Sequence, residues 1–353
     1  MGYAAGLLVS DRVVGRGQVL GAATWHRFLG ADPAAITGGI ATDGVVAITG
    51  GYPVGSFGAG GAGNPNNPGA FRLNPGSAWE PRLNFGTSGV IRARTRGSRF
   101  LFVGERQGAG TPPYASFSDD GGNTLTPING LGDNTRDIWA LVDNGAVWCA
   151  GCRRDAAAGP LFFTSADNGM TWTPRAVIDF PFVGPAGIVH DMCLDPSAPG
   201  RMWCCGYNNG IAFSDNNGVN WTIVPQAQIG GPAVNILGIA ANGIVVAAVG
   251  DSIGGGQSKI VTSPDTAIWT QRANTQAAGL FSIEVLPGSK RFLAVGGTKP
   301  DGTAYAVLGS PDGVTWTEIP LPFHTQTTQV TRLGRRIYVT GFGGVVSWSD
   351  NFQ

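Results

Sequence analysis

Short apolar stretches separated by turns predict β-strands along most of the chain. They recur as pairs in which a polar start leads into a first strand and a second strand ends in glycine. Examples are residues 136–141 with 146–151, 234–239 with 244–250, and 281–286 with 291–296. Strand pairs repeated at a spacing of about fifty residues predict an all-β repeat protein.

A second pattern follows these strand pairs. Three segments fit the template Ser-x-Asp-x-Gly-x-Thr-Trp with small variations, two later copies are shortened, and a degenerate copy ends at Trp79. In this template Ser and Asp bond the backbone of a tight turn, Gly permits positive φ, and Trp anchors the returning strand. We therefore expect hairpins, with structural roles for Ser118, Asp120, Gly122, Ser165, Asp167, Gly169, Trp172, Ser214, Asn216, Gly218, Trp221, Ser263, Asp265, Trp269, Ser310, Asp312 and Trp316.

These segments resemble the Asp-box, or bacterial neuraminidase (BNR) repeat. That repeat occurs in sialidases, xyloglucanases, sortilin-type receptors and many non-enzymatic propellers. The resemblance implies a sialidase-like β-propeller whose antiparallel blades have four strands each. Counting one anchor per blade predicts seven blades, with anchors at Trp25, Trp79, Leu125, Trp172, Trp221, Trp269 and Trp316.

The two ends of the chain are predicted to complete one blade. Strands at 329–333, 336–340 and 345–349 lack an outer strand, whereas 23–27 resembles an outer strand without inner partners. We therefore expect the N-terminal strand to close the last blade, because closure removes exposed sheet edges. Residues 21–353 would then form a single propeller, and residues 1–20 an N-terminal arm.

Composition excludes several classes of protein. The chain has 57 glycines in 353 residues, 42% hydrophobic residues and a net charge of zero. The balanced charge gives no strong nucleic-acid signal, and the absence of a long apolar window predicts no membrane span. The first residues lack the basic region of a secretory signal, so a virion protein made in the host cytoplasm, or a cytoplasmic protein, is expected. We predict no cofactor and no metal, because Cys149 and Cys152 lack a second ligand pair.

Candidate binding residues lie where the predicted inner strands begin, at the mouth of the central channel. Alignment of the repeats places five polar residues in one column, and Arg136 and His190 precede the first two of them. The column holds Asp137, Asp191, Asn235, Ser282 and Gln329. Two interpretations stay open: this polar ring binds a ligand, or it only solvates a water-filled channel.

The sequence leans against an enzyme without deciding the question. A sialidase needs three arginines, a Tyr activated by Glu, and an acidic proton donor. Of the four glutamates only Glu284 falls on a predicted inner strand, and no Tyr accompanies it. Another glycosidase would use Asp137 and Asp191 as paired carboxylates.

The preferred hypothesis is therefore a non-catalytic binding or structural propeller whose partners are other protein subunits of a larger assembly. By analogy with known tail propellers, the concrete case is a phage virion protein: a tail nozzle, a hub or a fibre-associated component. The alternatives are a hydrolase or lectin that binds glycan at the channel mouth, or an assembly factor resembling photosystem-assembly propellers.

Overall fold

The computed structural model describes residues 26–28, 35–42, 47–53, 70–73, 79–83, 90–106, 113–132, 136–154, 160–175, 187–253, 257–274, 279–298, 305–319, 327–341 and 346–349. The predicted arm at 1–20 and the anchor Trp25 lie outside these residues. Within them, no helix is long and apolar enough to cross a membrane.

The described strands form seven antiparallel sheets of four strands. The first three sheets in chain order are β2 (Ala35–Thr42), β3 (Ala47–Pro53), β4 (Ala70–Leu73) and β5 (Trp79–Leu83); β6 (Val90–Arg96), β7 (Arg99–Arg106), β8 (Pro113–Ser118) and β9 (Thr126–Pro127); and β10 (Arg136–Asp143), β11 (Trp148–Arg154), β12 (Phe162–Ser165) and β13 (Thr173–Pro174).

Three further sheets follow the same order. They are β14 (Val189–Leu194), β15 (Met202–Gly206), β16 (Gly210–Ser214) and β17 (Thr222–Ile223); β18 (Ile236–Ala241), β19 (Val246–Ser252), β20 (Ser258–Ser263) and β21 (Thr270–Gln271); and β22 (Leu280–Val285), β23 (Phe292–Thr298), β24 (Tyr305–Ser310) and β25 (Thr317–Glu318). A short 3-10 helix, η1 (Gln226–Gln228), follows β17.

The remaining sheet combines both ends of the chain. It contains β26 (Thr327–Leu333), β27 (Arg336–Gly341) and β28 (Val346–Ser349), and its outer position is occupied by β1 (His26–Phe28). His26 pairs with Trp348 and Phe28 with Val346, so the chain's first described strand runs antiparallel to its last.

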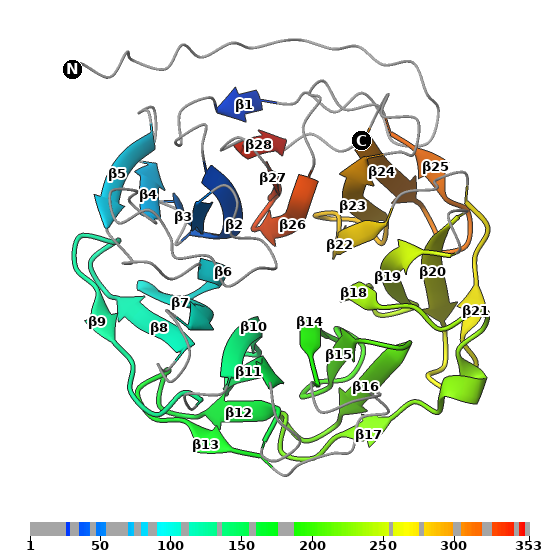
Figure 1. The fold of residues 1–353 in the computed structure, drawn as a ribbon, viewed down its shortest axis with the longest axis horizontal. Helices are drawn as coiled ribbons and strands as arrows, with labels where there is room; N and C mark the ends of the chain where they lie inside the picture. The colour runs from blue at the N-terminus through cyan, green and yellow to red at the C-terminus, as the bar shows by residue number, and fades with distance from the viewer. Residues whose placement is uncertain are drawn as a thin grey trace.

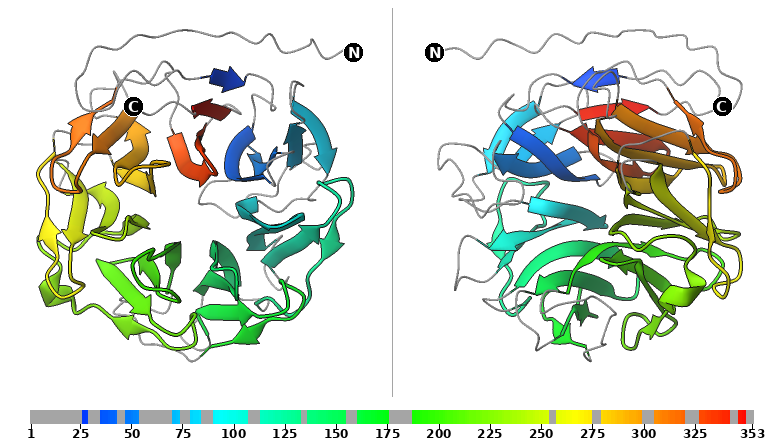
Figure 2. Two further views of the ribbon diagram at one scale, coloured as in Figure 1. Left: turned by 180° about the vertical axis from the view of Figure 1, so that it is seen from behind. Right: turned by 45° about the vertical axis from the view of Figure 1, so that its right-hand side comes forward.

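The sheets stand around a common centre (Figure 1). The strands nearest the middle, called inner strands below, are β2, β6, β10, β14, β18, β22 and β26. Consecutive inner strands contact one another, and β26 contacts β2 in turn. Two further views show the same ring from behind and obliquely (Figure 2). This arrangement brings the beginnings of inner strands from different sheets to one face, where the candidate residues were expected.

Apolar side chains fill the spaces between neighbouring sheets. The anchors Trp172, Trp221, Trp269 and Trp316 are buried. Trp221 stacks on Phe162 of the preceding sheet, with 4.1 Å between ring centroids, and Trp269 meets Trp203 edge to face at 5.7 Å. The anchors thus join one sheet to the next through large buried aromatic surfaces.

The Ser-x-Asp turns use their polar groups internally. In the turn at 165–172, the Ser165 hydroxyl donates to Asp167 at 2.8 Å and accepts from the Gly169 amide at 2.8 Å. The Thr171 amide and hydroxyl both donate to the Asp167 carboxylate. These hydrogen bonds lower the pKa of Asp167 to about 2.

The other turns repeat this geometry. Ser118 and Asp120 make the same bonds in the second sheet, and Asn216 replaces the carboxylate in the fourth. Gly122, Gly169, Gly218 and Gly313 have positive φ. The carboxylates of these turns accept hydrogen bonds from backbone amides of the same turn, which is a structural role.

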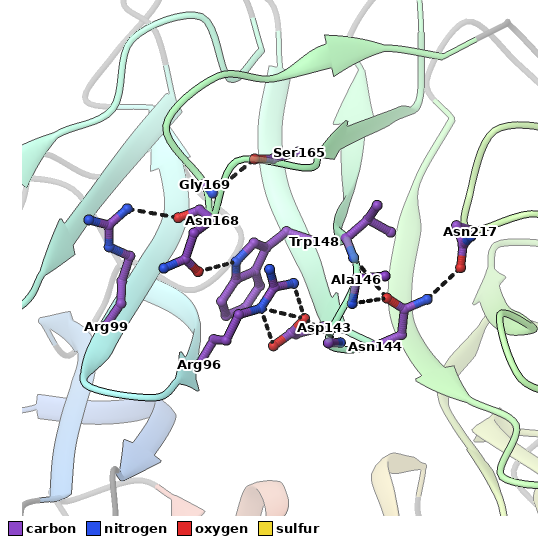
Figure 3. A network of polar contacts seen from close by, with 12 residues as sticks. Arg96, Arg99, Asp143, Asn144, Ala146, Trp148, Ser165, Asn168, Gly169 and Asn217 are labelled. Carbon is purple, nitrogen blue, oxygen red and sulfur yellow. Dashed lines mark hydrogen bonds and ion pairs between the residues drawn. The ribbon is translucent and has the colours of Figure 1, made fainter.

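The same turns connect neighbouring sheets (Figure 3). Arg99, the first residue of β7, donates to the carbonyl of Asn168 in the next sheet at 2.9 Å, while the Asn168 side chain accepts from the Trp148 indole. One sheet further, Asn144 donates to Asn217 at 2.6 Å. This face of the ring is therefore tied together by polar bonds as well as by the apolar core.

Candidate functional site

A β-bulge interrupts the pairing of each described inner strand near its beginning. The residues at the shift in six of them are Ile91, Trp139, His190, Leu237, Phe281 and Thr328. A bulge places one extra residue opposite the partner strand and re-aims its side chain. The strand beginnings therefore present side chains that a regular strand would not.

Glycine on the second strand permits this close packing. A Cβ on Gly250 would lie 2.0 Å from the Asn235 carbonyl oxygen, and one on Gly296 would lie 2.1 Å from the Gly279 carbonyl oxygen. No side chain fits at such distances, so these two glycines are required by the approach of the preceding inner strand.

The predicted single column of polar residues is wrong in its register. Asp191, Ser282 and Gln329 do share one position, immediately after the bulge. Asp137 lies before the bulge of β10, next to Ile138, and Asn235 precedes β18 in the equivalent place. The position shared by the first three residues is occupied instead by Ala140 in β10, Gly238 in β18 and Arg92 in β6. The alignment matched polar residues, whereas pairing with the second strand sets the true register.

Asp137 is held by an arginine from the neighbouring sheet. Its Oδ1 atom accepts from the Arg106 amide at 2.9 Å and from the Arg106 Nε at 3.0 Å. On the adjacent strand, Arg153 pairs in register with Asp137. Arg136 pairs with Arg154 through the backbone one residue earlier.

Glu105, which lies on no predicted inner strand, interacts electrostatically with Asp137, Arg106 and Arg153. Burial, reinforced by the charge of Asp137, raises its pKa to about 7, against the opposing influence of Arg153 and Arg106. A carboxyl group with this pKa changes its charge near neutral pH. Sequence reasoning missed Glu105 because it lies on β7, the second strand of its sheet, yet next to the first strand of the following one.

Asp191 connects three sheets. Arg92 Nη2 of β6 lies 3.3 Å from Asp191 Oδ1, and the Ile239 amide of β18 donates to Oδ2 at 3.4 Å. At the register position of Arg92, the intervening strand β10 carries the small residue Ala140. The carboxylate is therefore engaged as an inter-sheet tie.

Ser282 plays a similar part further around the ring. Its hydroxyl donates to the Val330 carbonyl at 3.4 Å, and the Val330 amide approaches it at 3.3 Å. Asn235 donates to Asp251 of the same sheet at 2.9 Å. Gln329 is buried, and among the described residues its Oε1 atom has no hydrogen-bond partner.

Charged residues on the inner strands of different sheets act on one another electrostatically. Burial and the charge of Arg92 lower the pKa of Arg94 on β6, while Asp191 and Glu284 oppose this effect. Burial raises the pKa of Glu284 on β22, against the charges of Arg94 and Arg332. The strands β6 and β22 lie on different sides of the centre (Figure 1). The alternating arginines at 92, 94 and 96 are the sequence signal that could have pointed to this cluster.

His190 sits between aromatic rings at the same mouth. Its imidazole contacts Trp139 of β10, with 5.3 Å between ring centroids, and Tyr207 at 5.0 Å, both edge to face. Burial, with the positive charges of Arg92 and Arg153, lowers the pKa of His190 to about 3. The imidazole is therefore neutral at physiological pH.

The cysteines are buried or half-buried free thiols. Burial raises the pKa of Cys149 and Cys204, which keeps both thiols protonated. Among the residues that the structure describes, no three His, Cys, Asp or Glu side chains gather as metal ligands.

Solved structures with the same architecture identify the fold. YCF48 bound to D1 peptide matches with a TM-score of 0.64 and 14% identity, over 93% of this chain and 95% of that one. Virginiamycin B lyase from Staphylococcus aureus matches with a TM-score of 0.66 and 12% identity, over 92% and 98%. This chain is a β-propeller.

The propeller also matches a GH74 xyloglucanase from Xanthomonas campestris, with a TM-score of 0.62 and 12% identity over 92% of this chain. It spans only 53% of that enzyme. No protein-family model matches the sequence, and no curated protein matches it significantly. At these identities the likeness concerns the fold alone, and the neighbours include both binding proteins and enzymes.

Proposed function

We propose that this propeller is a non-catalytic component of a protein assembly and binds a protein partner at the mouth formed by the inner-strand beginnings. The observation that carries this proposal is how the structure bonds Asp137 and Asp191, the two carboxylates that a glycosidase would use. Asp137 is bonded to Arg106, and Asp191 to Arg92 and Ile239. Carboxylates tied to arginines across sheets stabilise the ring and are poorly suited to serve as a paired acid and nucleophile.

We also propose that each four-stranded sheet is one blade of a seven-bladed Asp-box propeller. The pairing of β1 with β28 then supplies the outer strand that closes the ring. A closed ring has no long free sheet edge, so partners dock on its two faces and its rim. The solved YCF48 structure with a D1 peptide is an example of this fold holding a protein ligand.

For the assembly we propose a phage virion, in the tail, on the analogy with tail propellers. The test is mass spectrometry of purified virions from the phage or prophage that carries this gene, together with the genes next to it. Detection at a fixed stoichiometry beside tail proteins is expected. Absence from virions, with no tail, portal or capsid genes nearby, contradicts the virion assignment.

A glycan-acting hydrolase is the second candidate, and Glu105 favours it. Glu105, whose pKa is raised to about 7, lies beside Asp137, which accepts hydrogen bonds from Arg106. Two carboxyl groups in such different surroundings are typical of an acid and its partner. The test is turnover of a glycan panel by the wild type and by Glu105→Gln; activity abolished by this substitution would replace the binding proposal.

A further inference from the structure

In the part of the chain that the structure describes, three buried nitrogen atoms at the mouth have no hydrogen-bond partner: His190 Nε2, Trp139 Nε1 and Arg92 Nε. His190 is only 9% exposed, and the Arg92 side chain 11%. Buried polar groups in folded proteins are nearly always hydrogen-bonded, so a group of unpartnered ones requires an explanation.

The three side chains belong to one place. Trp139 and His190 are in ring contact, and Arg92 Nη2 lies 3.3 Å from the His190 carbonyl oxygen. They come from β10, β14 and β6, three consecutive sheets of the ring. The bulges of β10 and β14 fall at Trp139 and His190 themselves, so the fold aims both side chains away from the regular strand direction.

The chemistry of the unpartnered atoms selects the ligand. An indole N–H and a guanidinium N–H can only donate, and a neutral imidazole contributes one donor and one acceptor. The ligand must therefore bring acceptor atoms. The charges of Arg92 and Arg153 act on His190, and Asp191 is paired with Arg92 through Nη2. The Nε atom of Arg92 is left to donate to a further acceptor, and a charged acceptor makes the stronger hydrogen bond with a guanidinium.

We propose that Arg92, Trp139 and His190 form a subsite for a carboxylate group, presented by an Asp or Glu side chain of a protein partner. A carboxylate offers two oxygens that accept several hydrogen bonds, which suits a group of donors contributed by different strands. The source of the carboxylate rests on the proposed function; the chemistry of the subsite does not.

The test is an NMR titration of the purified chain with the blocked peptide acetyl-Gly-Glu-Gly-amide, whose only charge is the Glu side chain. The Gln analogue is the matched neutral peptide. The resonances followed are the Trp139 indole N–H, identified by its loss in Trp139→Phe, and the His190 imidazole, identified with His190→Gln. We expect both to shift with the Glu peptide and neither with the Gln peptide.

Variants separate the subsite from general electrostatics. Trp139→Phe keeps an aromatic ring at this position and removes the indole N–H donor. We expect the dissociation constant for the Glu peptide to rise roughly tenfold in this variant, as for loss of a hydrogen bond to a charged group. Arg201→Gln, which removes a distant arginine paired with Asp215, is the control and leaves the affinity unchanged. Circular dichroism confirms that each variant is folded.

Two results overturn the proposal: equal shifts with both peptides, or no shift of either resonance. Tighter binding of oligogalacturonate than of the Glu peptide overturns the protein source of the carboxylate. If the Glu peptide binds but the protein is found in no assembly, the proposed function is contradicted and the carboxylate subsite is still supported. A partner bound equally well by wild type, Trp139→Phe and His190→Gln contradicts the subsite alone.

Discussion

Arg92 and Asp191 form an ion pair between two sheets that are not neighbours. Their side chains approach to 3.3 Å and are 11% and 10% exposed. The strand between them, β10, contributes only the small Ala140 at this position. A partly desolvated pair of this kind fixes the positions of three inner strands at once.

Breaking this pair is expected to destabilise the fold. Arg92→Ala leaves the Asp191 carboxylate buried without its counter-charge, at an expected cost of about 3 kcal/mol. Urea unfolding of Arg92→Ala, Asp191→Asn and the double variant measures the coupling. The exposed pair Arg201–Asp215 is the control, for which removal of Arg201 is expected to change the free energy of unfolding by less than about 1 kcal/mol. Equal losses at both pairs would contradict the role given to Arg92.

The turn carboxylates are expected to contribute to stability and not to binding. Asp167→Ala removes the acceptor for the Thr171 amide and hydroxyl and for Ser165, with an expected loss of about 1 to 2 kcal/mol. Met170→Ala, on the same turn with an exposed side chain, is the matched control and should unfold with the wild type. Thermal unfolding of the two variants tests this prediction. A melting temperature of Asp167→Ala identical to that of Met170→Ala argues against a structural role for the Asp167 carboxylate.

Glu105 makes stability depend on pH near neutrality. Its pKa is raised from 4.5 to about 7, so between these values the folded state holds a proton that the unfolded state has released. The contribution of Glu105 to stability therefore falls as pH rises through this window. Glu105→Gln removes the titration, and we expect its advantage over the wild type to grow from pH 4.5 to pH 7.5 in urea unfolding. A difference that is constant with pH would contradict the raised pKa.

Gly250 is expected to tolerate no side chain. Its Cβ would lie 2.0 Å from the Asn235 carbonyl oxygen, so Gly250→Ala must displace the beginning of β18, at an expected cost above about 2 kcal/mol. Gly279→Ala is the comparison, because its Cβ would meet nothing closer than 3.5 Å. Similar melting temperatures for the two variants would contradict this prediction, because they would show that the beginning of β18 can move without a loss of stability.

Much of the fold could be predicted from the sequence, because its determinants are local. The box turns at 165–172 and 214–221 bond within themselves, and a template of a few residues captures them. Trp221 needs only an apolar surface on the preceding sheet, which Phe162 supplies. All-β sheets of four antiparallel strands follow from such units, and the neighbours confirm the propeller.

The candidate site was predicted less well, because its contacts join residues distant in the sequence. Asp191 was singled out, but its partner Arg92 lies in a sheet two places earlier and carries no motif. Asp137 and Asn235 were misplaced by the bulges, which leave no local sequence signature. Glu105 acquires its unusual pKa only from burial against the next sheet, a property that appears after folding.

The pairing of β1 with β28 constrains the order in which the protein can fold. His26 and Trp348 lie far apart in the sequence, so β1 can pair with β28 only after all the residues between them have been synthesised. The other sheets are built from consecutive strands and can form as they emerge, whereas this one waits for the longest loop closure in the molecule. Until β28 has been synthesised, β1 lacks this pairing partner, so the sheet that contains both strands is expected to form last.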